Sequence, residues 1–333
     1  AGINFDFRHM DHLLAYAHGE PNAEIVGIAH HDPREMQDVI RNLQVPADRV
    51  FTDWQACLAQ TKPDVAILCP AYPDHAEWIE RVASYGVHVL IEKPFAINLT
   101  QADRMIAAMK NARRQLAINW PLAWYPPHVT AHRLLREGRI GELQEVHFYD
   151  GNRGPIQSNP KLGAPEPSLA TKKRSWFYAP EGGGSLIDYL GYGATIATWY
   201  FDGRKPDEIT AVTAAAKGVP VDEQSVTIAR YGEWLSTFQT RWGTFTHPWI
   251  HQHQPKCGFV LKGTQGTIAN YDYEPTIRLQ TARHPEGRII PVDKPKKPRA
   301  NPVQYLLHCL ETGAPITGPI SVATSRIGQQ IVD

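Results

Sequence analysis

Short apolar runs alternate with amphipathic segments along the first 120 residues of the chain. Dense apolar runs bounded by polar residues predict β-strands over Glu24–His30, Asp64–Cys69, Val87–Ile91 and Gln115–Asn119. Apolar side chains at helical spacing, or residues that favour a helix start, predict helices over Pro33–Leu43, over Asp74–Tyr85 and from Thr100 onward. Strands and helices that alternate at this pitch predict βαβ units and a parallel sheet wound with helices on both faces.

The pattern changes after about residue 140. Segments that often alternate apolar and polar residues predict strands of an antiparallel sheet over Glu142–Tyr149, Glu208–Ala216, Gln224–Tyr231, Trp234–Trp242, Cys257–Lys262 and Thr267–Asn270. The stretch Gly151–Pro180 is rich in Pro, Ser, Lys and Gly and lacks periodicity, which predicts a long functional loop such as a substrate wall. Asn301–Glu311 and Ser321–Ile331 predict two closing helices.

The composition narrows the function classes. The 34 basic and 34 acidic residues give a formal net charge of zero, which argues against a protein that binds nucleic acid or an anionic membrane. The apolar content of 42% is globular, and no apolar run is long enough to span a bilayer. The four cysteines form no CxxC pair, so we expect buried thiols in a reducing, cytoplasmic compartment. No signal peptide is apparent, and because the chain opens at Ala1 rather than Met we expect that an upstream segment has been lost.

Two motifs carry candidate chemistry. Glu92–Pro94, with a lysine at its centre, directly follows a predicted buried strand, at the edge where parallel sheets bind ligands. The alternative is a surface lysine in a turn. Three glycines at Gly182–Gly184 would let the backbone approach a ligand closely. They precede Asp188 and Tyr192, which are four residues apart and so lie on one face of the helix that follows. As structure alone, this second motif would be a flexible turn before an amphipathic helix.

In order and spacing these motifs resemble those of the Gfo/Idh/MocA family, the relatives of glucose–fructose oxidoreductase and inositol dehydrogenase. The likeness covers nearly the whole chain. The family's EKP, its GGGxLxDxGxH pattern, its strand-end stretch ending in His and its GxIGE turn are matched at Glu92–Pro94, Gly182–Tyr192, Cys69–His75 and Gly138–Glu142. The resemblance implies an α/β Rossmann-type dinucleotide-binding domain over residues 1–120. It also implies an α+β substrate and oligomerisation domain over residues 121–333, with an open, mainly antiparallel sheet and a final helix that returns to the first domain.

The resemblance implies catalytic roles for three residues. Lys93 would hydrogen-bond the reacting hydroxyl and stabilise negative charge on its oxygen as the proton leaves. Tyr192 stands where most members have a catalytic His, and a neighbouring Lys ammonium would favour its phenolate, so we expect Tyr192 to act as acid/base. Asp188 would orient the substrate or Lys93. We also expect the Lys93–Pro94 peptide to be cis. The expected substrate-binding residues are Asn119, Trp124, Trp176, Asp188 and Tyr192, with core packing as the alternative for the tryptophans.

The first loop departs from the family pattern. Asn4, Asp6 and His9 replace the three glycines of GxGxxG. Asp6 adds negative charge near the pyrophosphate of a bound dinucleotide, whereas Arg8, His9 and the following helix N-terminus would offer donors to phosphate. Only Ala1–Ile3 precede this loop, so we expect the first strand to be nearly absent.

The sequence leaves the choice between NAD and NADP open. Two histidines, His30 and His31, stand where an acidic residue would take the adenosine ribose hydroxyls. Without that carboxylate, either Arg34 pairs with a 2′-phosphate or Asp32 takes the ribose. The expected cofactor-binding residues are Asn4, Phe5, Asp6, Arg8, His9, His30, Arg34, Pro70, Ala71, His75, Glu92, Lys93 and Pro94.

These features predict an NAD(P)-dependent oxidoreductase that transfers hydride at a secondary carbinol of a sugar, glycoside or cyclitol. The altered glycine loop keeps open a non-catalytic protein of the same fold that senses a dinucleotide or a sugar. A third option is a tightly held cofactor that is recycled within each catalytic cycle. We expect a homodimer or homotetramer formed through the C-terminal sheet, and no nucleic-acid or membrane partner. His247, His251 and His253 are close in sequence, but without an evident fourth ligand we expect no metal site.

Overall fold

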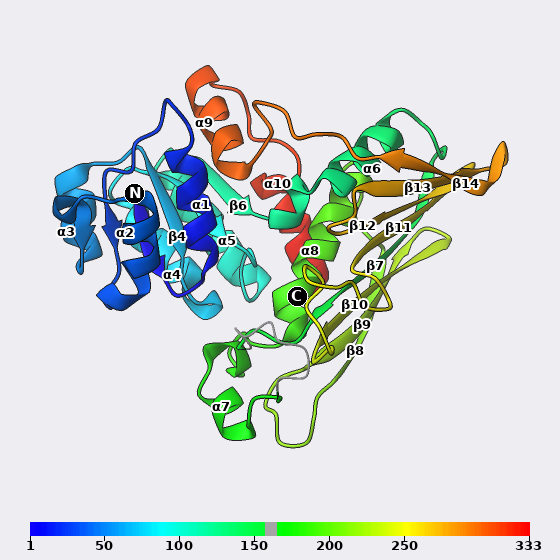
Figure 1. Ribbon diagram of the computed structural model, residues 1–333, viewed down its shortest axis with the longest axis horizontal. Helices are drawn as coiled ribbons and strands as arrows, with labels where there is room; N and C mark the ends of the chain where they lie inside the picture. Colours follow the sequence, from blue (N-terminus) through cyan, green and yellow to red (C-terminus); the bar gives the residue numbers. More distant parts are fainter. Residues whose placement is uncertain (157–164) are drawn as a thin grey trace. The chain divides into compact units, whose positions relative to one another are not determined.

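The computed structural model describes residues 1–156 and 165–333 (Figure 1). The chain forms two compact units, each described by itself below. Unit 1 comprises residues 1–120 and 295–326, and unit 2 comprises residues 121–294 and 327–333. The segment 295–326 therefore joins the unit built by the start of the chain.

Unit 1 is built on a six-stranded sheet in which all neighbouring strands are parallel, in the order β3-β2-β1-β4-β5-β6. Its central strands are aliphatic and almost wholly buried, as expected for a parallel sheet covered on both faces. The order reverses between β1 and β4, which is the point where such sheets bind ligands. The strands are β1 (Gly2–Phe5), β2 (Ile28–Ala29), β3 (Val50–Phe51), β4 (Val65–Cys69), β5 (His88–Glu92) and β6 (Leu116–Asn119).

Helices connect the parallel strands of unit 1, and α4 and α5 pack against each other. The α-helices are α1 (His9–His18), α2 (Gln37–Leu43), α3 (Trp54–Thr61), α4 (His75–Ala83), α5 (Leu99–Asn111) and α9 (Pro302–Thr312), followed by α10 (Val322–Val332), which continues into unit 2. The 3₁₀ turns are η1 (Pro33–Met36), η2 (Ala47–Arg49) and η3 (Tyr72–Asp74).

Several predicted boundaries in unit 1 were wrong. The strand predicted over Glu24–His30 pairs in the sheet only at Ile28–Ala29, where it lies between β1 and β3. Helix α5 begins before Thr100, since the side chain of Asn98 accepts a hydrogen bond from the backbone of Gln101 and caps the helix. Strand β1 extends to Phe5 and is longer than predicted. The sequence pattern also missed β3 and α3.

Unit 2 contains an eight-stranded sheet in the order β14-β13-β12-β11-β7-β10-β9-β8. Every neighbouring pair is antiparallel except β7 and β10, which run parallel, so the sheet is mixed but mainly antiparallel as predicted. The prediction missed the last two strands. The strands are β7 (Leu143–Asn152), β8 (Glu208–Ala214), β9 (Gln224–Tyr231), β10 (Trp234–Trp242), β11 (Gly258–Gly263), β12 (Gly266–Tyr271), β13 (Thr276–Thr281) and β14 (His284–Pro291).

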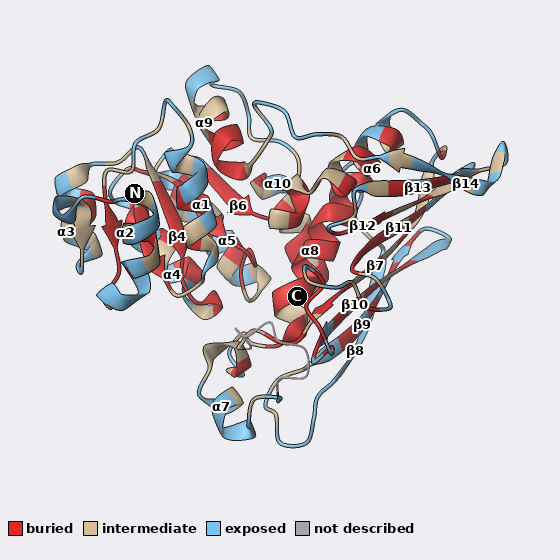
Figure 2. Cartoon of the chain, viewed as in Figure 1, coloured by how far each residue is buried: buried red, intermediate tan, exposed pale blue. Residues whose placement is uncertain are grey.

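Helix α8 (Ser185–Tyr200) packs along one face of this sheet (Figure 1). Almost all of its residues are buried, so it is a core helix rather than the amphipathic helix of the structural alternative (Figure 2). Close packing requires glycine at one point, because a Cβ on Gly193 would lie 2.4 Å from a ring carbon of Phe148 in β7. The remaining helices of unit 2 are α6 (Pro126–Arg136) and α7 (Leu169–Lys173), with 3₁₀ turns η4 (Pro121–Trp124) and η5 (Trp176–Tyr178).

The loop predicted over Gly151–Pro180 is only partly irregular. It contains the end of β7, helix α7 and turn η5, and its residues 157–164 lie outside the described part of the chain. Ser168 caps α7 by accepting a hydrogen bond from the backbone of Thr171. This capping residue was a local signal for a helix, but the prediction rested on the lack of periodicity and missed it.

All four cysteines are free and buried, as predicted. The cytoplasmic location inferred from them stays a prediction. Over the described residues, no helix combines the length and the hydropathy needed to cross a membrane.

Candidate functional site

Lys93 lies at the carboxyl end of β5 and is only 2% exposed. Its ammonium Nζ donates a hydrogen bond to the hydroxyl of Tyr72, 2.8 Å away, on the turn that follows β4. The same Nζ is 4.9 Å from the ring centroid of Phe7, on the loop that follows β1. The Lys93–Pro94 peptide is cis, which confirms the prediction. Three strand-end loops therefore converge on one buried cation, and sequence reasoning had missed Tyr72 and Phe7, its two aromatic neighbours.

Glu92, the preceding residue, is fully buried and joins three elements of unit 1. Its Oε2 accepts a hydrogen bond of 2.7 Å from the amide Nδ2 of Asn119, at the end of β6. Its Oε1 lies 2.7 Å from Nδ1 of His9, the first residue of α1. Asn119 was predicted to bind substrate and Glu92 and His9 to bind cofactor, and the structure brings these three side chains together.

The loop after β1 keeps a backbone course suited to a dinucleotide but lacks free donors at its start. Asn4 adopts the left-handed conformation with φ of 68°, which asparagine tolerates. Its Oδ1 accepts the backbone N–H of Asp6 at 2.8 Å, and Nδ1 of His30 accepts that of Phe5 at 3.1 Å. The N–H of Phe7 donates to the carbonyl oxygen of Cys69 at 3.1 Å. The loop thus has the strand–turn–helix arrangement that suits a dinucleotide. However, the backbone N–H groups of Phe5, Asp6 and Phe7 already donate to acceptors within the chain.

The carboxylate of Asp6 connects the loops after β1 and β4, the two strands between which the strand order reverses. Its Oδ2 accepts the backbone N–H of Ala71, 3.2 Å away, on the loop after β4. Its Oδ1 lies 3.8 Å from Nε2 of His30. Burial lowers the pKa of His30, more strongly than the charge of Asp6 raises it. At neutral pH the imidazole is therefore uncharged and does not cancel the negative charge of Asp6.

The outer residues predicted to hold the adenosine end are engaged with one another. The guanidinium of Arg34 donates hydrogen bonds to both carboxylate oxygens of Asp32, and these bonds, together with one from the Arg34 backbone, hold the pKa of that carboxyl well below its ordinary value. Arg8 is largely exposed and pairs with Asp38 of α2 at 3.3 Å. This part of the chain holds both a carboxylate for a ribose and a guanidinium for a phosphate, so NAD and NADP stay undistinguished.

His75, at the start of α4, has no exposed surface. Its Nδ1 lies 3.3 Å from the carbonyl oxygen of Phe95 and its Nε2 lies 3.3 Å from that of Pro70. Burial lowers the pKa of His75 to about 4, so the ring is neutral under ordinary conditions. The ring therefore links the loops after β4 and β5 from within the core.

In unit 2, the glycine motif at Gly182–Gly184 packs closely against the backbone of turn η5. A Cβ on Gly183 would lie 2.2 Å from the carbonyl oxygen of Phe177 in η5. The first turn of α8 is capped by Asp222, whose Oδ2 accepts bonds from the Ser185 hydroxyl at 2.6 Å and the Leu186 backbone at 2.9 Å. Sequence reasoning missed Asp222, because it lies between two strands and reaches the helix only through the tertiary fold.

Asp188 and Tyr192 lie one turn apart on α8, and both are buried. The indole Nε1 of Trp242, at the end of β10, donates to Oδ2 of Asp188 at 3.1 Å and fixes that carboxylate. The two tryptophans predicted as a substrate wall lie on separate 3₁₀ turns. Trp124 ends η4, whereas Trp176 begins η5 and stacks on Phe177 with ring centroids 3.7 Å apart.

The histidine-rich loop of unit 2 is spread over different environments. His247 is buried and stacks on Trp249, whereas His251 is exposed. The ring nitrogens of His253 lie 3.0 and 3.1 Å from the carbonyl oxygens of Pro255 and Gly151. Within residues 1–156 and 165–333, no group of three or more His, Cys, Asp or Glu side chains is arranged to hold a metal ion.

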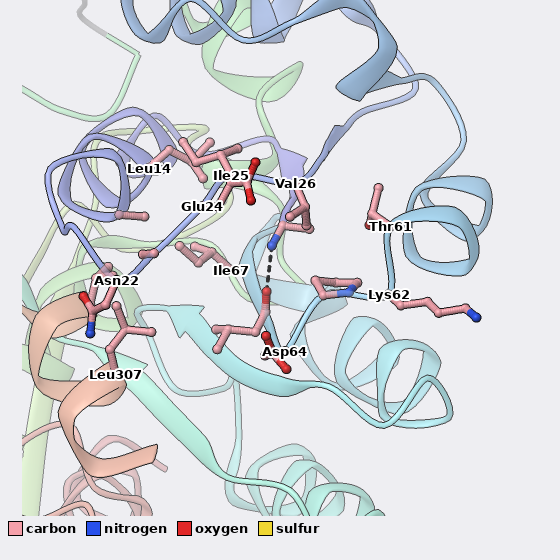
Figure 3. Close-up of a pocket in the computed structure, with 16 residues that line it drawn as sticks. Leu14, Asn22, Glu24, Ile25, Val26, Thr61, Lys62, Asp64, Ile67 and Leu307 are labelled. Carbon is pink, nitrogen blue, oxygen red and sulfur yellow. Dashed lines mark hydrogen bonds between the residues drawn. The ribbon is translucent and has the colours of Figure 1, made fainter. Parts of the chain in front are cut away.

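None of these residues lines the cavity of about 300 Å³ in unit 1 that Figure 3 shows. It is found at the amino ends of the strands, where the amine of Ala1 donates to the carbonyl oxygen of Val65 at 2.7 Å. Its lining includes Leu14, Val26 and Ile67. Parallel sheets bind ligands at the opposite, carboxyl edge, so this cavity is not part of the candidate site.

Comparison with known protein families gives matches to both parts of the chain. Residues 4–120 match the model of an oxidoreductase family with an NAD-binding Rossmann fold, and residues 128–269 match the C-terminal domain model of the same family. D-apiose dehydrogenase of Paraburkholderia graminis is 29% identical over 42% of this chain and 36% of its own length. A dTDP-3,4-didehydro-2,6-dideoxy-alpha-D-glucose 3-reductase of Saccharopolyspora spinosa is 26% identical over 74% of this chain and 66% of its own.

Solved structures share the fold across the whole chain. A levoglucosan dehydrogenase in complex with NADH and levoglucosan superposes with a TM-score of 0.78 at 18% identity, covering 100% of this chain and 94% of that one. An oxidoreductase from Agrobacterium radiobacter, in complex with NAD+, L-tartaric acid and magnesium, gives 0.76 at 18% identity, with 99% and 93% covered. The chain spans only about a third to three fifths of the first curated relatives that it matches. With both of its domains matched by the family models, the chain belongs to the Gfo/Idh/MocA oxidoreductase family.

Proposed function

We propose that the chain is an NAD(P)-dependent oxidoreductase that transfers hydride at a secondary carbinol of a sugar, glycoside or cyclitol. The observation that carries the proposal is the buried cation of Lys93 at the carboxyl end of β5, held by the Tyr72 hydroxyl and the Phe7 ring. A cation with its solvent largely removed stabilises developing negative charge far better than one in water. Family membership and relatives that act on carbohydrates support the same reaction class.

The cofactor, when bound, supplies or accepts the hydride, and the side chains manage the proton and the charge on oxygen. Lys93 donates a hydrogen bond to the reacting hydroxyl and favours its oxyanion. Tyr192 exchanges the hydroxyl proton, for which its phenol group provides a transferable hydrogen. Asp188, held in one orientation by Trp242, accepts a hydrogen bond from the substrate.

Positions for the cofactor are those that the resemblance assigns in unit 1. Pro70, Ala71, Glu92 and Lys93 stand at the carboxyl ends of β4 and β5, where a doubly wound sheet holds its ligand. The Asp32–Arg34 pair accepts either cofactor, because the carboxylate suits a ribose hydroxyl and the guanidinium suits a 2′-phosphate. Calorimetric titration with NAD and NADP decides between them.

A non-catalytic sensor is the second candidate. It is favoured by one observation, that the backbone donors of the first loop are engaged within the chain. A sensor would bind dinucleotide or sugar without turning either over. The enzyme is the stronger proposal, because a sensor has no use for a buried lysine beside a tyrosine hydroxyl at a strand end.

The quaternary structure belongs to the same proposal. On the outward face of β8, β9 and β10, Val212, Val226, Ile228 and Leu235 are exposed and lie on paired neighbouring strands. A face of this composition suits association with a second copy, so a homodimer or homotetramer forms through this sheet. Light scattering tests it, and a monomer at micromolar concentration would refute it.

The decisive experiment for the reaction is a panel of sugars, glycosides and cyclitols incubated with each cofactor. Formation or loss of the reduced nicotinamide chromophore with one substrate supports the enzyme. Binding of cofactor by calorimetry without turnover of any panel member supports the sensor. If neither cofactor binds and no substrate reacts, both proposals fail.

A further inference from the structure

Asp6 lies at the point where the strand order of unit 1 reverses. Strand β1 pairs with β2 on one side and β4 on the other, and the loops that leave β1 and β4 diverge from there. Doubly wound sheets bind the phosphates of dinucleotides in this crevice, which a glycine usually lines. Here the carboxylate of Asp6 bridges it, since its Oδ2 accepts the N–H of Ala71 across the two loops.

The surroundings of Asp6 leave its charge largely uncompensated. The imidazole of His30 faces it at 3.8 Å but is kept neutral by burial. Helix α1, which follows the loop, carries the acidic Asp11 in its first turn, which opposes the positive end of the helix dipole. The side chain of Asp6 is about one quarter exposed, so its charge acts through a medium with a much lower effective dielectric than bulk water.

Three backbone donors at the start of the same loop are engaged within the chain. The N–H groups of Phe5, Asp6 and Phe7 donate to His30, Asn4 and Cys69, respectively. In a glycine loop, such groups point at the pyrophosphate and no side chain intervenes. In this chain a phosphate oxygen has to displace one of these acceptors while it approaches a carboxylate.

We propose that Asp6 is an internal anion that occupies the phosphate position of the first loop and weakens the binding of the dinucleotide's pyrophosphate. The inference rests on the proposed function insofar as a dinucleotide is the ligand. Its consequence is that the cofactor exchanges with the pool in solution and is not held through successive turnovers. The residue therefore sets cofactor affinity without taking part in the chemistry.

The test compares ligands that do and do not carry the pyrophosphate. Asp6→Asn removes the charge while keeping a side-chain oxygen for the N–H of Ala71, and Asp6→Gly restores the family residue. The matched control is Asp48→Asn, which removes the same charge from an exposed aspartate of η2 in the same unit. Calorimetric titrations with ADP-ribose, NAD and adenosine are made on the full chain, and circular dichroism establishes that each variant is folded.

For Asp6→Asn we expect the dissociation constants of ADP-ribose and NAD to fall at least about tenfold, because a like charge a few ångströms from the phosphates is removed. Adenosine, which carries no phosphate, should bind both forms equally, and Asp48→Asn should behave as the wild type. For Asp6→Gly we expect the same fall in the dissociation constants of ADP-ribose and NAD. This variant controls for tighter binding caused by a new contact of the asparagine amide with the phosphates.

The inference is overturned if neither Asp6 variant tightens ADP-ribose, or if adenosine tightens by the same factor. It is also overturned if no form of the protein binds ADP-ribose. These outcomes are separate from those of the proposed function. Tighter ADP-ribose binding without turnover of any carbohydrate sinks the enzyme and leaves the role of Asp6. If the wild type turns a carbohydrate over, but Asp6→Asn leaves the affinity for ADP-ribose unchanged, the enzyme stands and the role of Asp6 is refuted.

Discussion

Nδ1 of His9 lies 2.7 Å from Oε1 of Glu92, which joins the start of α1 to the carboxyl end of β5 across 83 positions of sequence. His9 replaces the last glycine of the family's first loop, and Glu92 opens the EKP motif. Glu92 is fully buried and also accepts the amide of Asn119, so one carboxylate ties together three elements of unit 1. The imidazole of His9, which stands in place of the glycine, therefore contacts the EKP motif of the same unit.

This arrangement predicts that Glu92→Ala destabilises the protein by about 1–3 kcal/mol, because the buried amide of Asn119 and the partly exposed ring of His9 lose their acceptor. Glu92→Gln should cost less, since its amide oxygen still accepts one of the two bonds. Urea unfolding followed by circular dichroism measures both. The control is Glu77→Ala, which removes an exposed pair with Arg81 and should cost at most about 0.5 kcal/mol. Equal effects of the two alanine variants would contradict the role given to Glu92.

Lys93→Met should lower kcat by about 10²–10³-fold on the substrate found in the panel, because a donor to the developing oxyanion is lost while the aliphatic packing is kept. Lys93→Arg should not restore the rate, since a planar guanidinium does not fit a site shaped for a point charge beside Tyr72. Lys110→Met, at an exposed position near the end of α5, is the control for loss of one charge. A normal kcat in Lys93→Met would remove Lys93 from the mechanism.

Tyr192→Phe keeps the ring in the core and deletes the transferable hydrogen. If Tyr192 moves the proton, kcat should fall by about 10²–10⁴-fold, with cofactor affinity unchanged by calorimetry. Tyr192→His should recover part of the loss, because histidine exchanges a proton near neutral pH. Tyr16→Phe, at an exposed position of α1, is a control for the same deletion. A loss below about threefold, where chemistry is rate-limiting, would leave Tyr192 a packing residue.

His75 predicts a defined dependence of stability on pH. Its pKa is lowered from 6.5 to about 4 in the folded protein by burial, so the unfolded chain binds the proton first as the pH falls. Above pH 6.5 the titration of His75 does not lower the free energy of unfolding. As the pH falls from 6.5 to about 4, that free energy decreases by about 3 kcal/mol in total. The difference between wild type and His75→Gln in urea unfolding at several pH values isolates it from other histidines. A difference that is constant from pH 7 to about 4 would contradict this assignment.

Much of the fold could be predicted from the sequence, because its signals are local. A buried parallel strand is a continuous aliphatic run, and β4 and β5 were found within a residue or two of their bounds. The alternating strands β9 and β10 were found at their observed ends. Three strands were missed: β3 has only two residues and β14 is largely exposed, whereas the alternation of Ile277 and Leu279 with polar residues in β13 was a usable signal.

The candidate site divides in the same way. The motifs at Lys93, and at Asp188 with Tyr192, are contiguous in sequence and identified the chemistry and the family. Their contacts with Tyr72 and Trp242 were not predicted, because each of these aromatic residues comes from a distant strand end.

By itself, then, the sequence determined the fold class, the order of the main elements and the residue types available for catalysis. Only the tertiary structure decided how the altered first loop is used. In the sequence, Asp6 and His9 are isolated departures from a glycine pattern, and His30 stands where an acidic residue is expected. In the folded chain each has a partner contributed by another strand or strand-end loop, because the carboxyl ends of parallel strands bring residues far apart in sequence to one edge of the sheet.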